Sequence, residues 1–361
     1  MKIGVLTYHN TRNCGAVLQA YALQKVLLEL GMENEIIDYR CDKIEETYRL
    51  RRLWEIKSIK MFIKWALKIK SDKRTQKKFE DFRKNMLMLS GAYTKDNIKN
   101  ANKEFDGFIT GSDQVWNFHL NGCDYTYLLD FADMDKKKVS YAASMGSSVA
   151  KDSHNKIFNE ALASFDLVSV REKPLEEYIK RTVGISPTLV LDPTLLLKKE
   201  GYNFAAKWTK PEYKYIFVYT IATTPNIERA ARELSKKTGL PIIWGHMSYK
   251  KKSGVKNLTD LAPDEFVNYI KNAEYVLTSS FHGMALSIVM KKQFFYDLDV
   301  NTQNNNSRLE TLAEQLELNH RELSQDSKNL DEEKKIDYSA VDEKLEIKKK
   351  ESMDFLKGII K

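Results

Sequence analysis

The chain has few of the features that mark secreted, disulfide-rich, zinc-binding or membrane-spanning proteins. Its 361 residues include three cysteines, which are odd in number, far apart and without the spacing of metal ligands (Cys14, Cys41 and Cys123). No apolar run approaches the roughly 18 residues of a membrane span. The opening MKIGVLTYHN lacks the basic region and cleavage site of a signal peptide. We therefore expect a cytoplasmic protein without disulfide bonds or a metal site.

Several sequence signatures of catalysis and cofactor binding are also missing. H-E-x-x-H, G-x-S-x-G and P-loop patterns do not occur, and neither does the dinucleotide fingerprint G-x-G-x-x-G. The sequence therefore gives no support to metal-dependent hydrolysis, serine hydrolysis or nicotinamide chemistry.

Positive charge is concentrated in one segment. The net charge is +8, yet the stretch from Arg51 to Lys84 alone has 13 basic and 4 acidic residues. On a helix, four of its lysines share one face (Lys57, Lys60, Lys64 and Lys68) and its apolar residues share another (Ile59, Phe62, Ile63, Ala66 and Ile69). We favour a helix packed on the core with a solvated lysine face; the alternative is a helix on anionic lipid headgroups. No nucleic-acid motif occurs, so a nucleic-acid partner is not expected.

Strand-like and helix-like segments alternate along the chain, which predicts parallel α/β domains. The expected strands are 2–8, 34–39, 105–111, 137–144, 165–171 and 188–192, then 213–221, 240–245, 275–280 and 293–298. We predict a first Rossmann-like domain over 1–197 with a helical insertion at about 45–88, a second over 198–337, and a C-terminal helix over 338–361 that packs back on the first domain. Ligands of such sheets bind at the carboxyl ends of the strands, which here face a cleft between the domains.

Two strand ends in the first half carry polar groups. Asn13 and Gly15 form a turn into a helix, which either binds an anion or hydroxyl or simply meets the needs of the fold. After the third strand comes GSDQVWN, which supplies Ser112, Asp113, Gln114, Trp116 and Asn117. Neutral hydrogen-bonding groups beside an aromatic plane suit the hydroxyls and ring face of a sugar. The alternative for Asp113 and Asn117 is a helix cap or an Asx-turn.

Two further strand ends favour anion binding. Arg171 follows FDLVSV, which would place its guanidinium at the rim of the cleft for a carboxylate or phosphate, unless it pairs with Glu172. After YVLT, a helix is expected to begin near His282. Its positive end would then present Ser279, Ser280 and the Gly283 amide to an anion, with an imidazole beside them.

Six motifs in this order and spacing resemble the polysaccharide pyruvyl transferase family over nearly the full chain. They are RNCGAVLQAYALQ, FDGFITGSDQVWN, SYAASMG, VSVREK, LVLDPTLLL and VLTSSFHGMALSIVMKKQFF. The resemblance implies two Rossmann-like domains in the GT-B arrangement, the first on the acceptor side and the second on the donor side. It also implies transfer of a pyruvyl group from phosphoenolpyruvate to sugar hydroxyls as a ketal, with no cofactor.

This chemistry needs a general acid and a clamp for the anionic donor. We assign the acid to His282 and the clamp to Arg171, Ser279, Ser280, Gly283 and Arg308, although Arg308 could instead be a solvated surface residue. The acceptor would be oriented by Asn13, Gly15, Ser112, Asp113, Gln114, Trp116 and Asn117. Asp113 could instead take the hydroxyl proton, although we favour orientation, and Trp116 supplies either a stacking face or the packing that fixes the loop.

The implied acceptor is a sugar of a capsule or exopolysaccharide, or of its lipid-linked precursor. The enzyme would then work in the cytoplasm, with peripheral contact to the inner membrane face. The alternatives are a nucleotide-sugar glycosyltransferase on the same architecture and a non-catalytic glycan-binding relative.

Overall fold

The first of two parallel sheets has seven strands. The computed structural model describes residues 1–146, 152–204, 208–221, 224–246, 251–299, 306–323, 330 and 334–359. The sheet has the order β3-β2-β1-β4-β5-β6-β7, with every pair parallel. Its strands are β1 (Lys2–Leu6), β2 (Glu33–Tyr39), β3 (Leu89–Tyr93), β4 (Gly107–Asp113), β5 (Lys137–Ala143), β6 (Leu167–Val170) and β7 (Thr188–Leu189). β4 is buried along its whole length, as expected for a central strand covered on both faces.

The helices of this half surround the first sheet, apart from the long α3. They are α1 (Cys14–Glu29), α2 (Asp42–Tyr48), α3 (Ile59–Met86), α4 (Phe118–Asn121), α5 (Asp152–Leu162), α6 (Lys173–Thr182) and α7 (Pro193–Leu196). Short 3-10 turns add η1 (Leu53–Glu55), η2 (Ile98–Lys103), η3 (Tyr125–Leu128) and η4 (Lys199–Tyr202). α1 is apolar nearly all round and is buried over most of its length, as suits a helix covered on more than one side.

The second sheet has five parallel strands in the order β10-β9-β8-β11-β12. Its strands are β8 (Ile216–Thr220), β9 (Ile242–His246), β10 (Lys256–Leu258), β11 (Tyr275–Thr278) and β12 (Gln293–Tyr296). Its helices are α8 (Pro225–Thr238), α9 (Pro263–Asn272), α10 (Phe281–Val289) and α11 (Ser307–Gln315), followed by η6 (Asn319–Arg321). Both sheets therefore have the Rossmann strand order, and the expected α/β fold class of two Rossmann-like domains in a GT-B-like arrangement is confirmed. The edge strands β3 and β10 were not among the expected strands.

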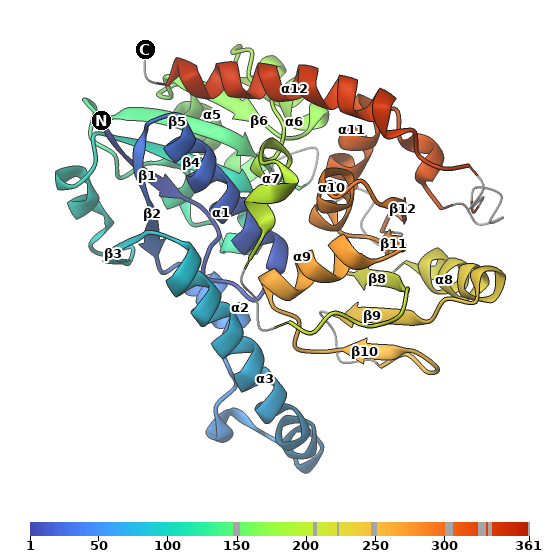
Figure 1. The fold of residues 1–361 in the computed structure, drawn as a ribbon. Coiled ribbons are helices and arrows are strands. Elements are labelled where there is room, and N and C mark those ends of the chain that lie inside the picture. Colours follow the sequence, from blue (N-terminus) through green and yellow to red (C-terminus); the bar gives the residue numbers. More distant parts are fainter. Residues whose placement is uncertain are drawn as a thin grey trace.

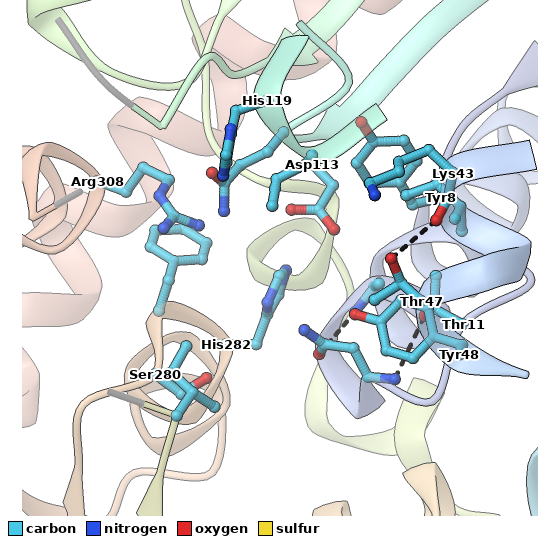
Figure 2. Close-up of a pocket in the computed structure, with 17 residues that line it drawn as sticks. Tyr8, Thr11, Lys43, Thr47, Tyr48, Asp113, His119, Ser280, His282 and Arg308 are labelled. Atoms are coloured by element: carbon cyan, nitrogen blue, oxygen red, sulfur yellow. Dashed lines mark hydrogen bonds between the residues drawn. The ribbon is translucent and has the colours of Figure 1, made fainter. Parts of the chain in front are cut away.

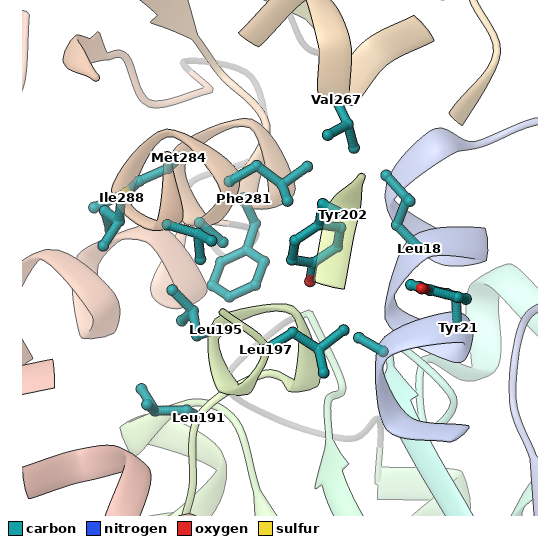
Figure 3. Packing of buried hydrophobic residues seen from close by; sticks show 14 of the residues in the cluster. Leu18, Tyr21, Leu191, Leu195, Leu197, Tyr202, Val267, Phe281, Met284 and Ile288 are labelled. Carbon is teal, nitrogen blue, oxygen red and sulfur yellow. The ribbon is translucent and has the colours of Figure 1, made fainter. Parts of the chain in front are cut away.

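A shared apolar core joins the two domains. Leu18 and Tyr21 of α1 and Leu195 of α7 belong to the same cluster as Val267 of α9 and Phe281 of α10 (Figure 3). The Tyr21 hydroxyl also donates a hydrogen bond to the Gly201 carbonyl at 2.9 Å. Because apolar burial is the main stabilising term in protein association, this cluster holds the domains against one another.

The C-terminal helix α12 (Tyr338–Gly358) contacts both domains and runs across them in Figure 1. At its start, the Tyr338 hydroxyl donates to the Lys292 carbonyl of the second domain. Near its end, the Ser352 hydroxyl accepts from the Leu191 amide of the first domain at 2.9 Å. The helix thus spans the domain boundary.

The helix α3 projects away from the body of the protein (Figure 1). Its buried residues are Phe79 and Phe82 in the second half, and no residue of 51–76, a stretch described throughout, is buried. The favoured expectation of a core-packed helix is therefore wrong for the first half of α3. The physical reason is that the apolar side chains of this half have no sheet beneath them. Within the described residues, no helix combines the length and apolar character that a membrane crossing would need.

Candidate active site

One pocket lies where the carboxyl ends of both sheets meet. The two central strands are β1 and β4 in the first sheet, and β8 and β11 in the second. The chain leaves the two strands of each pair in opposite directions, and ligands of such sheets bind in the crevice between these strand ends. A cavity of about 240 Å³ occupies this place. It is lined from the first domain by Tyr8, Thr11, Asn13, Ala16, Lys43, Ile44, Thr47, Tyr48, Asp113, Gln114, His119 and Leu120, and from the second by Ile221, Ser280, Phe281, His282 and Arg308 (Figure 2).

The end of β4 turns Asp113 into this pocket. Gly111 has a φ of 109°, and a Cβ there would lie 2.2 Å from the Tyr141 carbonyl oxygen, so only glycine fits. Asp113 itself has a φ of 77°, a left-handed conformation that is uncommon for a residue other than glycine. This backbone departs from a regular strand where the carboxylate of Asp113 faces the cavity.

His282 enters the pocket from the second domain. Ser280 caps α10, because its hydroxyl accepts from the Gly283 amide at 3.3 Å, and His282 follows in the first turn. The side chain is only 7% exposed. A Cβ on Gly15 of α1 would lie 2.1 Å from His282 Nδ1, so the absence of a side chain at this position lets the imidazole pack against the first domain. Asp113, Arg308 and His282 point toward the same space (Figure 2).

Asp192 is the partner of His282 across the domain boundary. Its Oδ2 lies 3.6 Å from His282 Nε2, accepts from Arg171 Nη1 at 2.7 Å and accepts from the Ser112 hydroxyl at 2.9 Å. Its Oδ1 caps α7 by accepting from the Thr194 amide. Burial opposes ionisation of Asp192, but His282, Arg171 and Thr194 outweigh burial and hold the pKa of Asp192 well below its ordinary value. His282 Nε2 has no hydrogen-bond partner in the described part of the chain.

Arg171 is not at the rim of the cleft. Its side chain is 1% exposed and lies behind Asp113, with Nη2 3.4 Å from Asp113 Oδ1 and its guanidinium 4.7 Å from the centre of the Phe281 ring. Burial disfavours its charge, but Asp192 and Asp113 outweigh burial and raise the pKa of Arg171. Glu172 instead accepts from the Ser144 hydroxyl at 2.9 Å. The arginine therefore holds two carboxylates in place and does not line the pocket.

Arg308 of α11 lines the pocket, so the alternative of a solvated surface residue is wrong. It is 8% exposed, and burial, with the nearby charge of Arg171, lowers the pKa of Arg308 to about 10. The group is therefore charged at neutral pH. When the carboxamide oxygen of Gln114 faces it, that oxygen accepts from Nη1 and Nη2 at 3.0 and 3.1 Å. Arg308 and Gln114 thus meet across the domain boundary.

Four residues of the predicted acceptor side serve the fold or pack near the pocket without lining it. Trp116 is fully buried, and its indole Nε1 donates to the Tyr127 carbonyl at 3.2 Å, so it cannot offer a stacking face. Ser112 is buried and bonded to Asp192, and Gly15 packs against His282. Asn117 caps α4 by accepting from the His119 and Leu120 amides, as its alternative reading held.

Two predicted donor-binding groups are engaged within the second domain. The Ser279 hydroxyl accepts from the Ile221 amide at 3.1 Å. The Gly283 amide donates to the Ser280 hydroxyl. These two groups fix the start of α10 and do not line the pocket. Of the residues predicted as site residues, the pocket brings together Asn13, Asp113, Gln114, Ser280, His282 and Arg308.

Several pocket residues were not predicted from the sequence. Lys43, Thr47 and Tyr48 come from α2, at the start of the helical insertion, and no motif marks them. His119 lies on α4, shortly after β4, and no motif marks it either. Asp192 had a visible signal, because it ends the apolar run TLVLD at a strand end, but nothing local indicates its contact with His282.

The arrangement combines a proton-carrying group with cations and hydrogen-bonding groups. His282 can hold a proton at the pocket, while Arg308 and Lys43 can attract an anion. Asp113 and Gln114 can accept or donate hydrogen bonds to hydroxyls. Among the described residues, no three or more His, Cys, Asp or Glu side chains are grouped to hold a metal ion.

Comparison with solved structures found similar chains of low sequence identity. A UDP-GlcNAc 2-epimerase from Methanocaldococcus jannaschii is 12% identical, with 96% of this chain and 92% of that chain covered and a TM-score of 0.45. The glycosyltransferase SnogD from Streptomyces nogalater is 9% identical, with 98% and 94% covered and a TM-score of 0.41. The E. coli heptosyltransferase WaaC is 12% identical, with 82% and 88% covered and a TM-score of 0.36. No curated protein matches the chain.

Comparison with protein families gives a match over most of the chain. Residues 13–296 match the family described as polysaccharide pyruvyl transferase. The matched region begins at the cap of α1 and ends with β12, so it contains His282 and all the strands of the two sheets except β1. The chain therefore belongs to the polysaccharide pyruvyl transferase family, which is a family of transferases.

Proposed function

We propose that the protein transfers the pyruvyl group of phosphoenolpyruvate to two hydroxyls of a sugar and forms a pyruvate ketal. The observation that carries this proposal is the position of His282. In a chain of this family, it lies in one pocket with Asp113 and Arg308, from both domains. The pocket thus combines an acid, a cation for the donor and hydrogen-bonding groups for hydroxyls.

In the proposed reaction, His282 gives a proton to the methylene carbon of the donor, which becomes a methyl group. One sugar hydroxyl bonds to the enol carbon, and its proton returns to the now neutral His282. A second hydroxyl of the same sugar then displaces the phosphate, which leaves with the proton of that second hydroxyl. Asp113 orients a hydroxyl, while Arg308 and Lys43 hold the carboxylate and phosphate.

The charges around His282 support its role as an acid. The buried side chains of this cluster carry two positive charges, Arg171 and Arg308, and three negative ones, Asp113, Glu172 and Asp192. Uncompensated buried charge is costly, and a protonated His282 would balance the sum. The proposed acceptor is a sugar of a surface polysaccharide or of its lipid-linked precursor, reached in the cytoplasm at the inner membrane face.

The test is donor use with a panel of glycan acceptors. We expect phosphate release from phosphoenolpyruvate only when a suitable glycan is present, with a product that gains one pyruvate ketal by mass spectrometry. Binding of a nucleotide sugar without binding of phosphoenolpyruvate would contradict the proposal and favour a glycosyltransferase. Glycan binding without use of either donor would favour a non-catalytic relative.

A further inference from the structure

The first half of α3 exposes a stripe of large apolar side chains. Ile59 is 81% exposed, Leu67 79%, Ile63 54% and Phe62 47%. Their spacing places them on one side of the helix. Trp54 of η1, which directly precedes α3, is 76% exposed. Soluble proteins rarely leave so many large apolar side chains together in water, so this outer face of α3 is expected to have a partner.

The inner face of α3, formed by Met61, Trp65 and Ile69, already contacts other parts of the chain. All three residues are half-buried, and the Trp65 indole donates to the Arg51 carbonyl at 3.0 Å. The Ser58 hydroxyl caps the helix by accepting from the Met61 amide at 3.2 Å. The exposed stripe is therefore not needed to hold the helix in place, and remains available for a partner.

The charge beside the stripe is of one sign. Residues 56–71 contain five lysines and no aspartate or glutamate. Lys60 and Lys64 lie next to the apolar stripe at helical spacing. An apolar face flanked by lysines is the pattern of a helix that lies in the interface of an anionic bilayer. A second copy of the chain is a poorer partner, because its own lysines would face these.

A groove on the inner face of α3, opposite the exposed stripe, leads to the active site. This groove of about 850 Å³ runs between α2 and η1 on one side and α3 on the other. Lys43 and Thr47 line both this groove and the active-site pocket. The pocket itself, at about 240 Å³, is smaller than the roughly 300–1,000 Å³ of common ligand sites, so a larger acceptor would extend into the groove.

We propose that the outer face of α3, together with Trp54, docks the protein on an anionic phospholipid membrane. The four apolar side chains enter the interface and the adjoining lysines contact lipid phosphates. Docking would also bring a lipid-linked acceptor to the groove, and this part of the proposal rests on the proposed function. The docking itself does not, and it is tested by binding alone.

The experiment is co-sedimentation of the full chain with phosphatidylcholine vesicles and with mixed phosphatidylcholine–phosphatidylglycerol vesicles. We expect binding to the mixed vesicles, with a blue shift of tryptophan emission that Trp54→Phe removes. Phe62→Ser/Leu67→Ser and Lys60→Glu/Lys64→Glu should each weaken binding by about tenfold or more. All variants should keep the wild-type melting temperature, because none of these side chains is buried.

Matched controls change two exposed apolar residues and two exposed lysines elsewhere on the surface. Ile157→Ser/Ile347→Ser removes two exposed isoleucines, and Lys236→Glu/Lys237→Glu reverses two exposed lysines on α8; both should bind vesicles as the wild type does. Equal binding by the α3 variants and the controls would overturn the proposal. So would failure of the folded wild type to bind mixed vesicles, or a dimer that Phe62→Ser/Leu67→Ser converts to a monomer without any vesicle binding.

Discussion

His282 of the second domain and Asp192 of the first face one another across the domain boundary, with Nε2 and Oδ2 3.6 Å apart. This distance is longer than a hydrogen bond, and the described structure offers His282 Nε2 no other partner. A small closing movement would bring the carboxylate and imidazole into contact. The proposed acid is therefore positioned only when the two domains are in register.

Asp192→Asn tests this positioning role. We expect kcat to fall by about 100-fold while the KM for phosphoenolpyruvate changes little, because the asparagine does not touch the donor. Steady-state kinetics measure kcat and the donor KM separately. A wild-type kcat in folded Asp192→Asn would contradict the positioning role.

The same substitution has a predicted effect on stability. Because the pKa of Asp192 is held below its ordinary value, its carboxylate stabilises the fold above the unfolded pKa of about 3.9, and this contribution is lost as the pH falls below that value. Asp192→Asn also leaves Arg171 without its closest partner, at a cost of about 3 kcal/mol at neutral pH. Urea unfolding should show that the difference in free energy of unfolding between the wild type and Asp192→Asn shrinks below about pH 4. A difference independent of pH would contradict the assignment.

Gly15→Ala tests the packing of α1 against the imidazole. A methyl group at this position would lie 2.1 Å from His282 Nδ1, so the imidazole must move or the domains must separate. We expect activity to fall by about 100-fold or more, because a displacement of the imidazole by about 1 Å is enough to misalign it with the donor. The control is Gly91→Ala, where no atom lies within 4 Å of the new methyl group, and it should leave activity unchanged. Full activity of Gly15→Ala would show that this contact is not needed.

Trp116→Phe separates packing from sugar stacking. Because the indole is fully buried and bonded to the Tyr127 carbonyl, we expect the free energy of unfolding to fall by about 2 kcal/mol, with the acceptor KM unchanged. Chemical denaturation and acceptor kinetics measure the two quantities. A tenfold rise in acceptor KM at unchanged stability would restore the stacking role.

Arg308→Ala tests the donor clamp. Arg308 is the arginine that lines the pocket, so its loss should raise the KM for phosphoenolpyruvate by about tenfold or more, in line with the worth of a charge-assisted hydrogen bond. Arg308→Lys should restore only part of the affinity for phosphoenolpyruvate, because a lysine cannot make a bidentate contact. Arg181→Ala, an exposed arginine on α6, is the control. An unchanged KM in Arg308→Ala would move the donor site elsewhere.

The strand ends were predictable because their signals are local. A buried run such as FDGFITG followed by polar residues predicts where a strand stops, and a Ser before FHG predicts a helix cap. The parallel topology then brings such ends to one edge. This reasoning placed Asp113, Ser280 and His282 at the pocket.

The positions of Arg171 and Trp116 could not be predicted from the sequence, because they depend on contacts between distant segments. Arg171 has two carboxylate partners, 58 and 21 residues away, and these draw it behind the pocket. Trp116 turns inward because Tyr127 offers a carbonyl for its indole. The exposure of Ile59 and Leu67 follows from the absence of a packing surface under α3, which helical periodicity alone does not reveal.

The central claim is that His282 supplies the proton for pyruvyl transfer, and one measurement tests it most directly. This is phosphate release from phosphoenolpyruvate, with a glycan acceptor, by the wild type, His282→Ala and His282→Gln. We predict that both variants lose at least about 100-fold in kcat while melting temperature and donor binding stay close to wild type. Phosphate release at the wild-type rate in either folded variant would contradict the account.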